Sequence, residues 1–254
     1  MPILADLLPA NETERLYALR QTDILNSLQE EVFDELVALS ARLFGLPISY
    51  IALLETDRLH YKASFGSSLP SPAPRQDVLC AQVVRHNRVV LYHDLTAATQ
   101  TPVDAPAIAN ALAQQARFYV GAPLRTAAEH AIGTLCLIGP SPRSFSGQEQ
   151  QVLEQLATVV VWLIVLRQRC LHTPALGAAH WQRVRDLVRD EIYSLGTLVR
   201  YLLQRYGALV PVPEDVLHLM ERRLRDVQLL IEENADQPRA GLVVPDYALA
   251  LVNK

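Results

Sequence analysis

Apolar residues in the first part of the chain recur at three- and four-residue steps, a spacing typical of amphipathic helices. The pattern predicts a first helix from Asn11 to about residue 26 and a second over residues 29–44. Asn11 is the expected N-cap of the first helix, with Glu14 three residues later as in a capping box. Gly45 is the expected C-terminal glycine of the second.

Dense apolar runs with β-branched and aromatic members then predict strands, separated by turn residues and shorter helices. The expected strands span residues 48–54, 59–65, 89–93, 118–124 and 131–138, and the shorter helices span 76–86 and 105–115. A long helix over 148–171 follows, with Ser146 as its N-cap. Because the strands form hairpins with helices at the ends and in the insertions, we expect an α+β fold with an antiparallel sheet.

After a break at residues 173–177, the pattern changes to two long helices that form an all-α helical hairpin over residues 178–236. One apolar stripe covers residues 181–203 and another covers 216–231. Two helices cannot bury two such stripes by themselves. We therefore expect the hairpin either to pair with a second copy as a four-helix bundle or to dock on the first domain. The tail, residues 237–254, is expected to be irregular.

Composition and charge narrow the classes of function. A formal net charge of -4 argues against nucleic acid as the main partner, because phosphate binding usually needs a basic face. Cys80, Cys136 and Cys170 lie far apart, with neither metal-ligand spacing nor a disulfide framework, which fits the cytoplasm. The start of the chain lacks the basic region of a signal peptide. The apolar run 156–166 is about half the length of a membrane span, so it predicts a buried helix.

A series of short motifs, none specific alone, resembles the GAF domain family in its order. The motifs are Glu14-Arg15-Leu16, Pro47–Leu53, Tyr61-Lys62-Ala63, Leu79-Cys80-Ala81, Phe118–Leu124 and Ile132–Ile138. The resemblance to bacterial members covers residues 11–171. It implies a GAF-like twisted antiparallel sheet with helices behind one face and a ligand pocket on the other, under variable helices and loops.

The hairpin resembles the dimerisation module of histidine kinases, which carries a phosphoacceptor histidine followed by an acidic residue. Asp190 and Glu191 stand where that pair is needed, and His180 lacks the context. The hairpin is therefore expected to pair helices rather than to transfer phosphate.

The GAF-like pocket is expected to be lined by residues from the strands and the short helix. The candidate ligand-binding residues are Tyr50, Ala52, Cys80, Tyr92, Asp94, Phe118 and Thr134. An apolar wall with a few converging polar groups is the usual composition of a ligand site. For Asp94 the alternative is that it caps the loop after its strand, and Arg117 is either an anion partner or a solvated side chain.

Particular ligands of GAF domains require particular residues. A bilin would need a Cys-His pair and a cyclic nucleotide an Asn-Lys-Phe-Asp-Glu signature, and the sequence has neither. For haem, His86 and His93 are the nearest candidates, and both are expected at the surface. The cofactor therefore stays unknown, and no metal site is predicted.

Cys80 raises the alternative of a thiol enzyme similar to the GAF-type reductases of free methionine sulfoxide. That chemistry needs a second cysteine to resolve the intermediate. The segment 88–117, where those enzymes carry such thiols, has none, and Cys136 is the other candidate. A small buried core residue is the simpler interpretation of Cys80.

The sequence thus predicts a cytoplasmic, non-enzymatic sensor or signalling module with no catalytic residue. It is expected to act as a homodimer through its terminal helices, with an unknown small molecule as ligand and a downstream signalling protein as a further partner. No nucleic acid and no membrane span are expected. The alternatives are the thiol enzyme and an adaptor or degenerate histidine-kinase fragment with an empty pocket.

Overall fold

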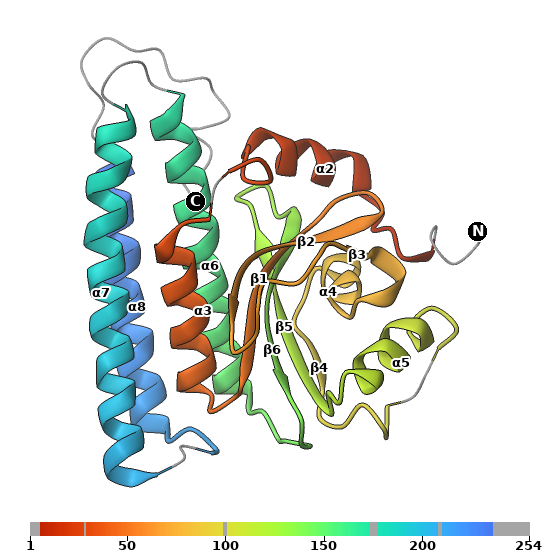
Figure 1. The fold of residues 1–254 in the computed structure, drawn as a ribbon. Helices are drawn as coiled ribbons and strands as arrows, with labels where there is room; N and C mark the ends of the chain where they lie inside the picture. The colour runs from red at the N-terminus through yellow and green to blue at the C-terminus, as the bar shows by residue number, and fades with distance from the viewer. Residues whose placement is uncertain (1–5, 28, 99–100, 173–176, 208–209, 236–254) are drawn as a thin grey trace.

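A computed structural model describes residues 6–27, 29–98, 101–172, 177–207 and 210–235. Its centre is an antiparallel sheet of six strands in the order β3-β2-β1-β6-β5-β4 (Figure 1). The strands are β1 (Ile48–Leu54), β2 (Arg58–Phe65), β3 (Ala73–Pro74), β4 (Val90–Tyr92), β5 (Phe118–Arg125) and β6 (Ala131–Gly139). The α+β fold with an antiparallel sheet is confirmed, and β3 is an added edge strand within a segment expected to be loop.

Helices cover both faces of this sheet, and on one face a further pair of helices packs outside the first. They are α2 (Glu12–Gln21), α3 (Glu31–Leu43), η1 (Arg75–Asp77), α4 (Cys80–His86), α5 (Ala105–Ala113), α6 (Gly147–Leu171), α7 (Gly177–Tyr206) and α8 (Glu214–Ala235). The helix expected over 76–86 is split, because Val78 is extended between η1 and α4. Ser146 caps α6 as predicted, in a complete capping box with Glu149.

The first helix differs from its prediction at both ends. Asn11 occupies the N-cap position but makes no capping hydrogen bond, and its side-chain amide nitrogen instead lies 2.9 Å from Nδ1 of His130. The helix ends at Gln21 rather than near residue 26. The Thr22 hydroxyl donates to the Leu19 carbonyl, and Asp23 takes a left-handed φ of 48°, which stops helical continuation.

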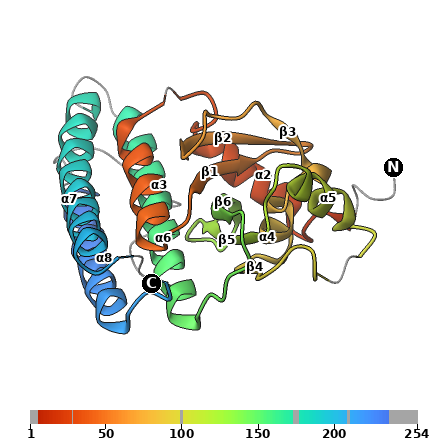
Figure 2. The same ribbon diagram turned by 60° about the horizontal axis from the view of Figure 1, so that its bottom comes forward.

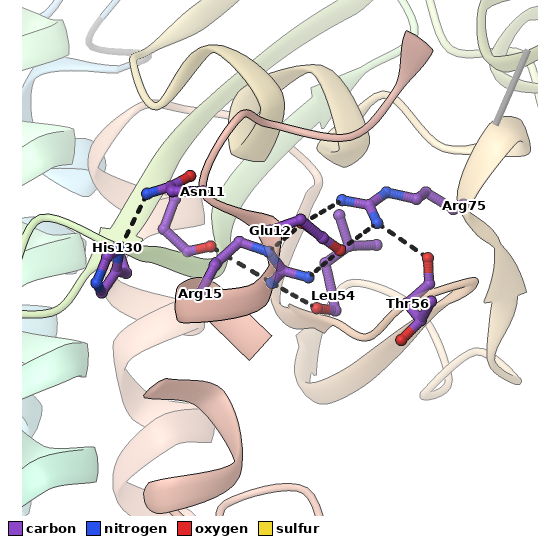
Figure 3. A network of polar contacts seen from close by, with 8 residues as sticks. Asn11, Glu12, Arg15, Leu54, Thr56, Arg75 and His130 are labelled. Carbon is purple, nitrogen blue, oxygen red and sulfur yellow. Dashed lines mark hydrogen bonds and ion pairs between the residues drawn. The ribbon is translucent and has the colours of Figure 1, made fainter. Parts of the chain in front are cut away.

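A buried ionic network ties α2 to the end of the sheet (Figure 3). The Glu12 carboxylate accepts from Arg15 Nε at 2.8 Å and from Arg75 Nη1 at 2.6 Å. Both arginines are almost fully buried, and they also donate to the carbonyls of Leu54 and Thr56. One carboxylate therefore joins α2, the β1–β2 turn and η1.

The sheet separates two hydrophobic clusters. On the back face, residues such as Ile51, Val120 and Leu135 pack with α3 and α6. On the front face, residues such as Ala52, Tyr119 and Cys136 pack with α4 and the segment around α5. Figures 1 and 2 show the same division from two directions, with α4 and α5 opposite α3 and α6.

The C-terminal hairpin docks on the back of the sheet domain. Helix α7 packs along α3, and α8 packs along α6, so the hairpin forms a second helical layer outside the layer of α3 and α6 (Figure 2). Both apolar stripes join the back-face cluster, including Trp181, Val188, Met220 and Leu224, all at least nine-tenths buried. Of the two arrangements expected for the hairpin, docking on the first domain is the one observed.

A polar contact fixes the start of α7 against α3 and α6. The Glu30 carboxylate accepts from Arg167 Nε of α6 at 2.6 Å and from the Trp181 indole of α7 at 2.9 Å. Arg189 of α7 also forms an ion pair with Glu31, but that glutamate is 80% exposed and the pair contributes little. Glu30 is therefore a buried polar link between the hairpin and the sheet domain, and Arg169 of α6 adds a second link by donating to the Ala235 carbonyl of α8.

Helix α6 is long and apolar enough, by composition, to cross a membrane, but 61% of its apolar window is buried inside the protein. It is the central helix of the back layer, between β5 and α8. The prediction of a buried helix is confirmed.

Replacing Trp181 with Ala should destabilise the chain by about 3–5 kcal/mol, because a large buried ring and the donor to Glu30 are lost together. Leu187→Ala on the same helix is the matched control: Leu187 is 51% exposed, so its loss should change stability by less than about 0.5 kcal/mol. Urea unfolding followed by circular dichroism measures both. Equal small losses would mean that α7 does not depend on this contact.

Replacing Glu12 with Gln should cost about 3–5 kcal/mol at neutral pH, because it leaves two buried guanidinium groups without a counter-charge. Burial raises the pKa of Glu12, but the hydrogen bonds from Arg15 and Arg75 outweigh it and bring the pKa below 4.5. The carboxylate therefore stabilises the folded chain above that pH, and the stabilisation is lost as the pH falls through the lowered pKa.

The measurement is the free energy of unfolding of wild type and Glu12→Gln between neutral pH and about pH 3. The variant should show a flatter decline toward acid. Glu14→Gln, at an exposed position of the same helix, is the control and should follow the wild type. If the free energy of unfolding falls with pH in the same way in Glu12→Gln and in the wild type, Glu12 does not cause the loss of stability in acid.

Candidate functional site

The front face of the sheet has a floor of small residues on its central strands. Ala52 of β1 lies opposite Thr134 of β6, and Gly121 of β5 lies opposite Cys136. Cys136 is also opposite Tyr50 on its other side. Small side chains at these adjoining positions let a helix approach the middle of the sheet closely.

Tyrosines border this floor on both sides. The rings of Tyr50 and Tyr61 meet edge to face with centroids 5.1 Å apart. Across the floor, the rings of Tyr92 and Tyr119 are 6.3 Å apart. Burial raises the pKa of Tyr61 and Tyr119, so both keep their hydroxyl proton and can act as donors.

Helix α4 lies on the floor. The sulfur atoms of Cys80 and Cys136 are 3.9 Å apart, and the Tyr119 hydroxyl donates to Cys80 Sγ at 3.4 Å. A Cβ atom on Gly121 would come within 2.6 Å of the Tyr119 hydroxyl and 2.9 Å of Val83 Cγ2. Only a glycine at this position lets α4 and Tyr119 approach the sheet as closely as they do.

The electrostatics of the two thiols differ although both are buried. The hydrogen bond between Cys80 and Cys136 lowers the pKa of Cys80 to about 7, against the opposing effect of burial. The same hydrogen bond, together with burial, raises the pKa of Cys136. The pair therefore holds one acidic thiol and one proton-retaining thiol side by side.

Several polar side-chain atoms in this half of the protein are buried without a hydrogen-bond partner among the described residues. They include both amide atoms of Gln82 on α4. Each such group costs about 1–3 kcal/mol relative to a hydrogen-bonded one. The packing between α4 and its surroundings is therefore not optimised for stability.

Five of the seven candidate residues lie together at this face, namely Tyr50, Ala52, Cys80, Tyr92 and Thr134. Phe118 does not: its side chain belongs to the back-face cluster, with its ring centroid 5.9 Å from that of Phe145. The expectation that Phe118 points into the pocket is wrong, because neighbouring strand residues face opposite sides. Tyr119 occupies the front-face position.

Asp94 lies outside the floor and holds a loop. Its carboxylate accepts two hydrogen bonds from Arg117, both 2.9 Å long, and others from the backbone and hydroxyl of Thr96. Donation by Arg117 holds the pKa of Asp94 well below its usual range. Of the two roles considered for Asp94, capping of the following loop matches this geometry, and Arg117 is its partner.

Tyr119, Tyr61 and Gln82 lie at the site but were not predicted there, and Cys136 was considered only as a second thiol for Cys80. The alternation of side chains along a strand offers a signal for Tyr119, since it shares a face with Gly121. The strand register needed to place Tyr61 beside Tyr50, and Cys136 beneath Cys80, cannot be read from composition or spacing.

A separate groove of about 430 Å³ lies on the helical side, between the β5–β6 turn, α6 and the end of α8. Trp162, Val165 and Ile231 contribute apolar surface, and Arg125 lies at its turn side. The guanidinium of Arg125 is engaged by Asn87 and Glu154. The groove therefore does not present that arginine to a ligand.

Residues 27–164 match the sequence model of the GAF domain family. The chain belongs to this family. It is also 30% identical to a cyclic di-GMP phosphodiesterase of Pseudomonas aeruginosa over 250 residues, which cover 95% of this chain and 40% of that protein. The chain thus spans less than half the length of this relative.

Solved structures include similar chains at low identity. The GAF domain of an Acinetobacter phosphoenolpyruvate-protein phosphotransferase is 16% identical with a TM-score of 0.45, covering 62% of this chain and 96% of that one. Free methionine-R-sulfoxide reductase of Neisseria meningitidis is 18% identical with a TM-score of 0.45, covering 59% and 86%. Neither similarity bears on the activity of this chain.

Replacing Gly121 with Ala should displace α4 and cost about 1–3 kcal/mol, because the added methyl group overlaps Tyr119 and Val83. The same displacement should make Cys80 react faster with a thiol reagent. Gly147→Ala is the control, since a Cβ there meets nothing within 4 Å. Thermal unfolding and the rate of thiol labelling test this prediction. If Gly121→Ala changes neither the unfolding temperature nor the labelling rate of Cys80, the space between α4 and the sheet can hold an added methyl group.

Proposed function

We propose that this chain is a non-enzymatic regulatory module of a cyclic di-GMP signalling protein, in which the state of the α4 face sets the position of the α7–α8 hairpin. One observation carries the proposal: the hairpin is docked on the helices that cover the back of the same sheet whose front carries α4. The similarity to the phosphodiesterase extends over 95% of the chain and therefore includes the hairpin.

The sheet supplies a short mechanical connection between the two faces. On β6, Thr134 and Cys136 face α4, while Leu135 and Leu137 lie in the back-face cluster with α6. A displacement of α4 that moves β6 therefore also shifts the residues that pack against α6 on the other face of the sheet. Packed interiors transmit such shifts because they have little spare volume.

The link to the hairpin then runs through Glu30. The Glu30 carboxylate accepts hydrogen bonds from Arg167 of α6 and from Trp181 of α7. A movement of α6 therefore changes the position of α7. Such a shift between packed helices is a common way for a domain to pass on a change of state. The proposed receiver is a domain that makes or degrades cyclic di-GMP and that responds to the position of α8.

The coupling can be tested without knowing a ligand, by using Gly121→Ala to displace α4. Hydrogen exchange should increase in α4 and also in α7 and α8, while Gly147→Ala changes neither. Faster exchange in α4 with an unaltered hairpin would contradict the proposed connection. Native mass spectrometry and an absorption spectrum of freshly purified protein would identify a bound species.

A second pair of variants tests the role of Glu30. Glu30→Gln weakens the acceptor shared by Arg167 and Trp181, so exchange in α7 should rise and the response of the hairpin to Gly121→Ala should shrink. Glu31→Gln, at an adjacent exposed position, should leave that response intact. An unchanged response in Glu30→Gln would exclude this link as the route.

Homodimerisation is a further part of the proposal. The apolar stripes expected to pair two copies are covered within one chain, so a dimer has to use outward-facing residues, among which Leu187, Tyr193 and Tyr201 of α7 are each about half exposed. Sedimentation at several concentrations should show a dimer that Tyr193→Lys weakens. A monomer at all concentrations would contradict this prediction.

A further inference from the structure

We propose that Cys80 and Cys136 are a redox-modification site, in which a hydroperoxide oxidises Cys80 and Cys136 then closes a reversible disulfide. The inference rests on the proposed function for its consequence, because the disulfide would act by drawing α4 toward the sheet. The chemistry itself depends only on the two thiols and their surroundings.

The distance between the sulfurs permits the bond after a small movement. They are 3.9 Å apart, in contact but not bonded, whereas a disulfide is about 2 Å long. Strand β6 is held on both sides by β1 and β5, so Cys136 is fixed. Helix α4 has seven residues and lies on the sheet without strand pairing, so it is the element that moves.

The two thiols have different roles. Both thiols are buried, but Cys80 lies on α4, the element that moves, and Cys136 lies on a strand that is paired on both sides. Cys80 is therefore the thiol that an oxidant reaches when α4 moves. Hydrogen bonds from the Tyr119 hydroxyl and from Cys136 stabilise a thiolate on Cys80, and its pKa is lowered to about 7. The thiolate is the form that attacks a peroxide. Cys136, beside it and shielded from solvent, is the resolving thiol.

The reaction balances without any group that the proposal leaves out. The Cys80 thiolate attacks one peroxide oxygen, the O–O bond breaks, and Cys80 becomes a sulfenic acid while the other oxygen leaves as water or alcohol after taking up a proton. The Cys136 sulfur then attacks the Cys80 sulfur and gives up its proton, the S–O bond of the sulfenic acid breaks as the S–S bond forms, and the hydroxide leaves as water after taking up that proton. The two thiols lose two electrons to the hydroperoxide in total. A dithiol reductant restores both thiols by disulfide exchange.

Closure would press α4 on a tightly packed part of the floor. Val83 of α4 already leaves no room for a Cβ on Gly121. The sulfur of Cys80 would also exchange its hydrogen bond with Tyr119 for a bond to Cys136. Oxidation therefore acts on the same contacts that Gly121→Ala perturbs.

The test treats the reduced full-length chain with hydrogen peroxide in small molar excess and counts free thiols under denaturing conditions. The count should fall from three cysteines to one, and peptide mapping should find Cys80 linked to Cys136. Dithiothreitol should restore all three. In Cys136→Ser, Cys80 should instead be trapped as a sulfenic acid by dimedone.

Cys170→Ser is the matched control, because Cys170 is buried in the back-face cluster on α6 and its loss leaves the pair intact. This variant should form the disulfide at the wild-type rate, and circular dichroism checks that each variant folds. Retention of all three thiols, or a link that involves Cys170, would overturn the proposal. Turnover of free methionine sulfoxide that Cys80→Ser abolishes would also overturn it, in favour of a catalytic pair.

Hydrogen exchange on the oxidised chain separates this proposal from the proposed function. Slower exchange in α4 with changed exchange in α7 and α8 supports both. A mapped Cys80–Cys136 disulfide with an unchanged hairpin supports the redox site and contradicts the coupling. Failure of the disulfide to form, with a hairpin that still responds to Gly121→Ala, contradicts the redox site alone.

Discussion

The arrangement of the protein depends on one helix that is apolar on more than one side. Helix α6 buries Val152, Leu156, Val160 and Leu163 among many others, and it lies between β5 and α8. The sheet can cover only one side of such a helix, so the other side needs a second cover. The hairpin supplies it, and for this reason α7 and α8 belong to the same hydrophobic cluster as the sheet.

This constraint explains what the sequence could and could not predict about the hairpin. The apolar stripes of the two helices indicate how much surface has to be buried, and they therefore predict that another apolar surface covers the hairpin. They do not state which partner, because another copy of the chain and the exposed side of α3 and α6 offer similar apolar surfaces. The choice is made by particular contacts such as Glu30 with Arg167 and Trp181, which join residues more than 130 positions apart in sequence.

The strands were predictable because β-branched and aromatic runs bounded by turns are a local signal. Which side each residue faces was harder for β5, because all residues from Phe118 to Leu124 are buried and hydrophobicity does not alternate. That is why Phe118 was expected at the site in place of Tyr119. The contact between Cys80 and Cys136 depends on how α4 sits on the sheet, and no local pattern encodes it.

The two ends of the front face are held in different ways, and this difference decides which part can act as a switch. At α2, the Glu12 carboxylate and two buried guanidinium groups form a network that is costly to disturb. At α4, the contacts with the floor are van der Waals packing and weak hydrogen bonds to sulfur, and both amide atoms of Gln82 are buried without a partner among the described residues. A movement of α4 away from the sheet therefore breaks fewer strong interactions than a movement of α2 would. The fold thus places a helix that is held by weak contacts directly above the strand whose opposite side contacts α6.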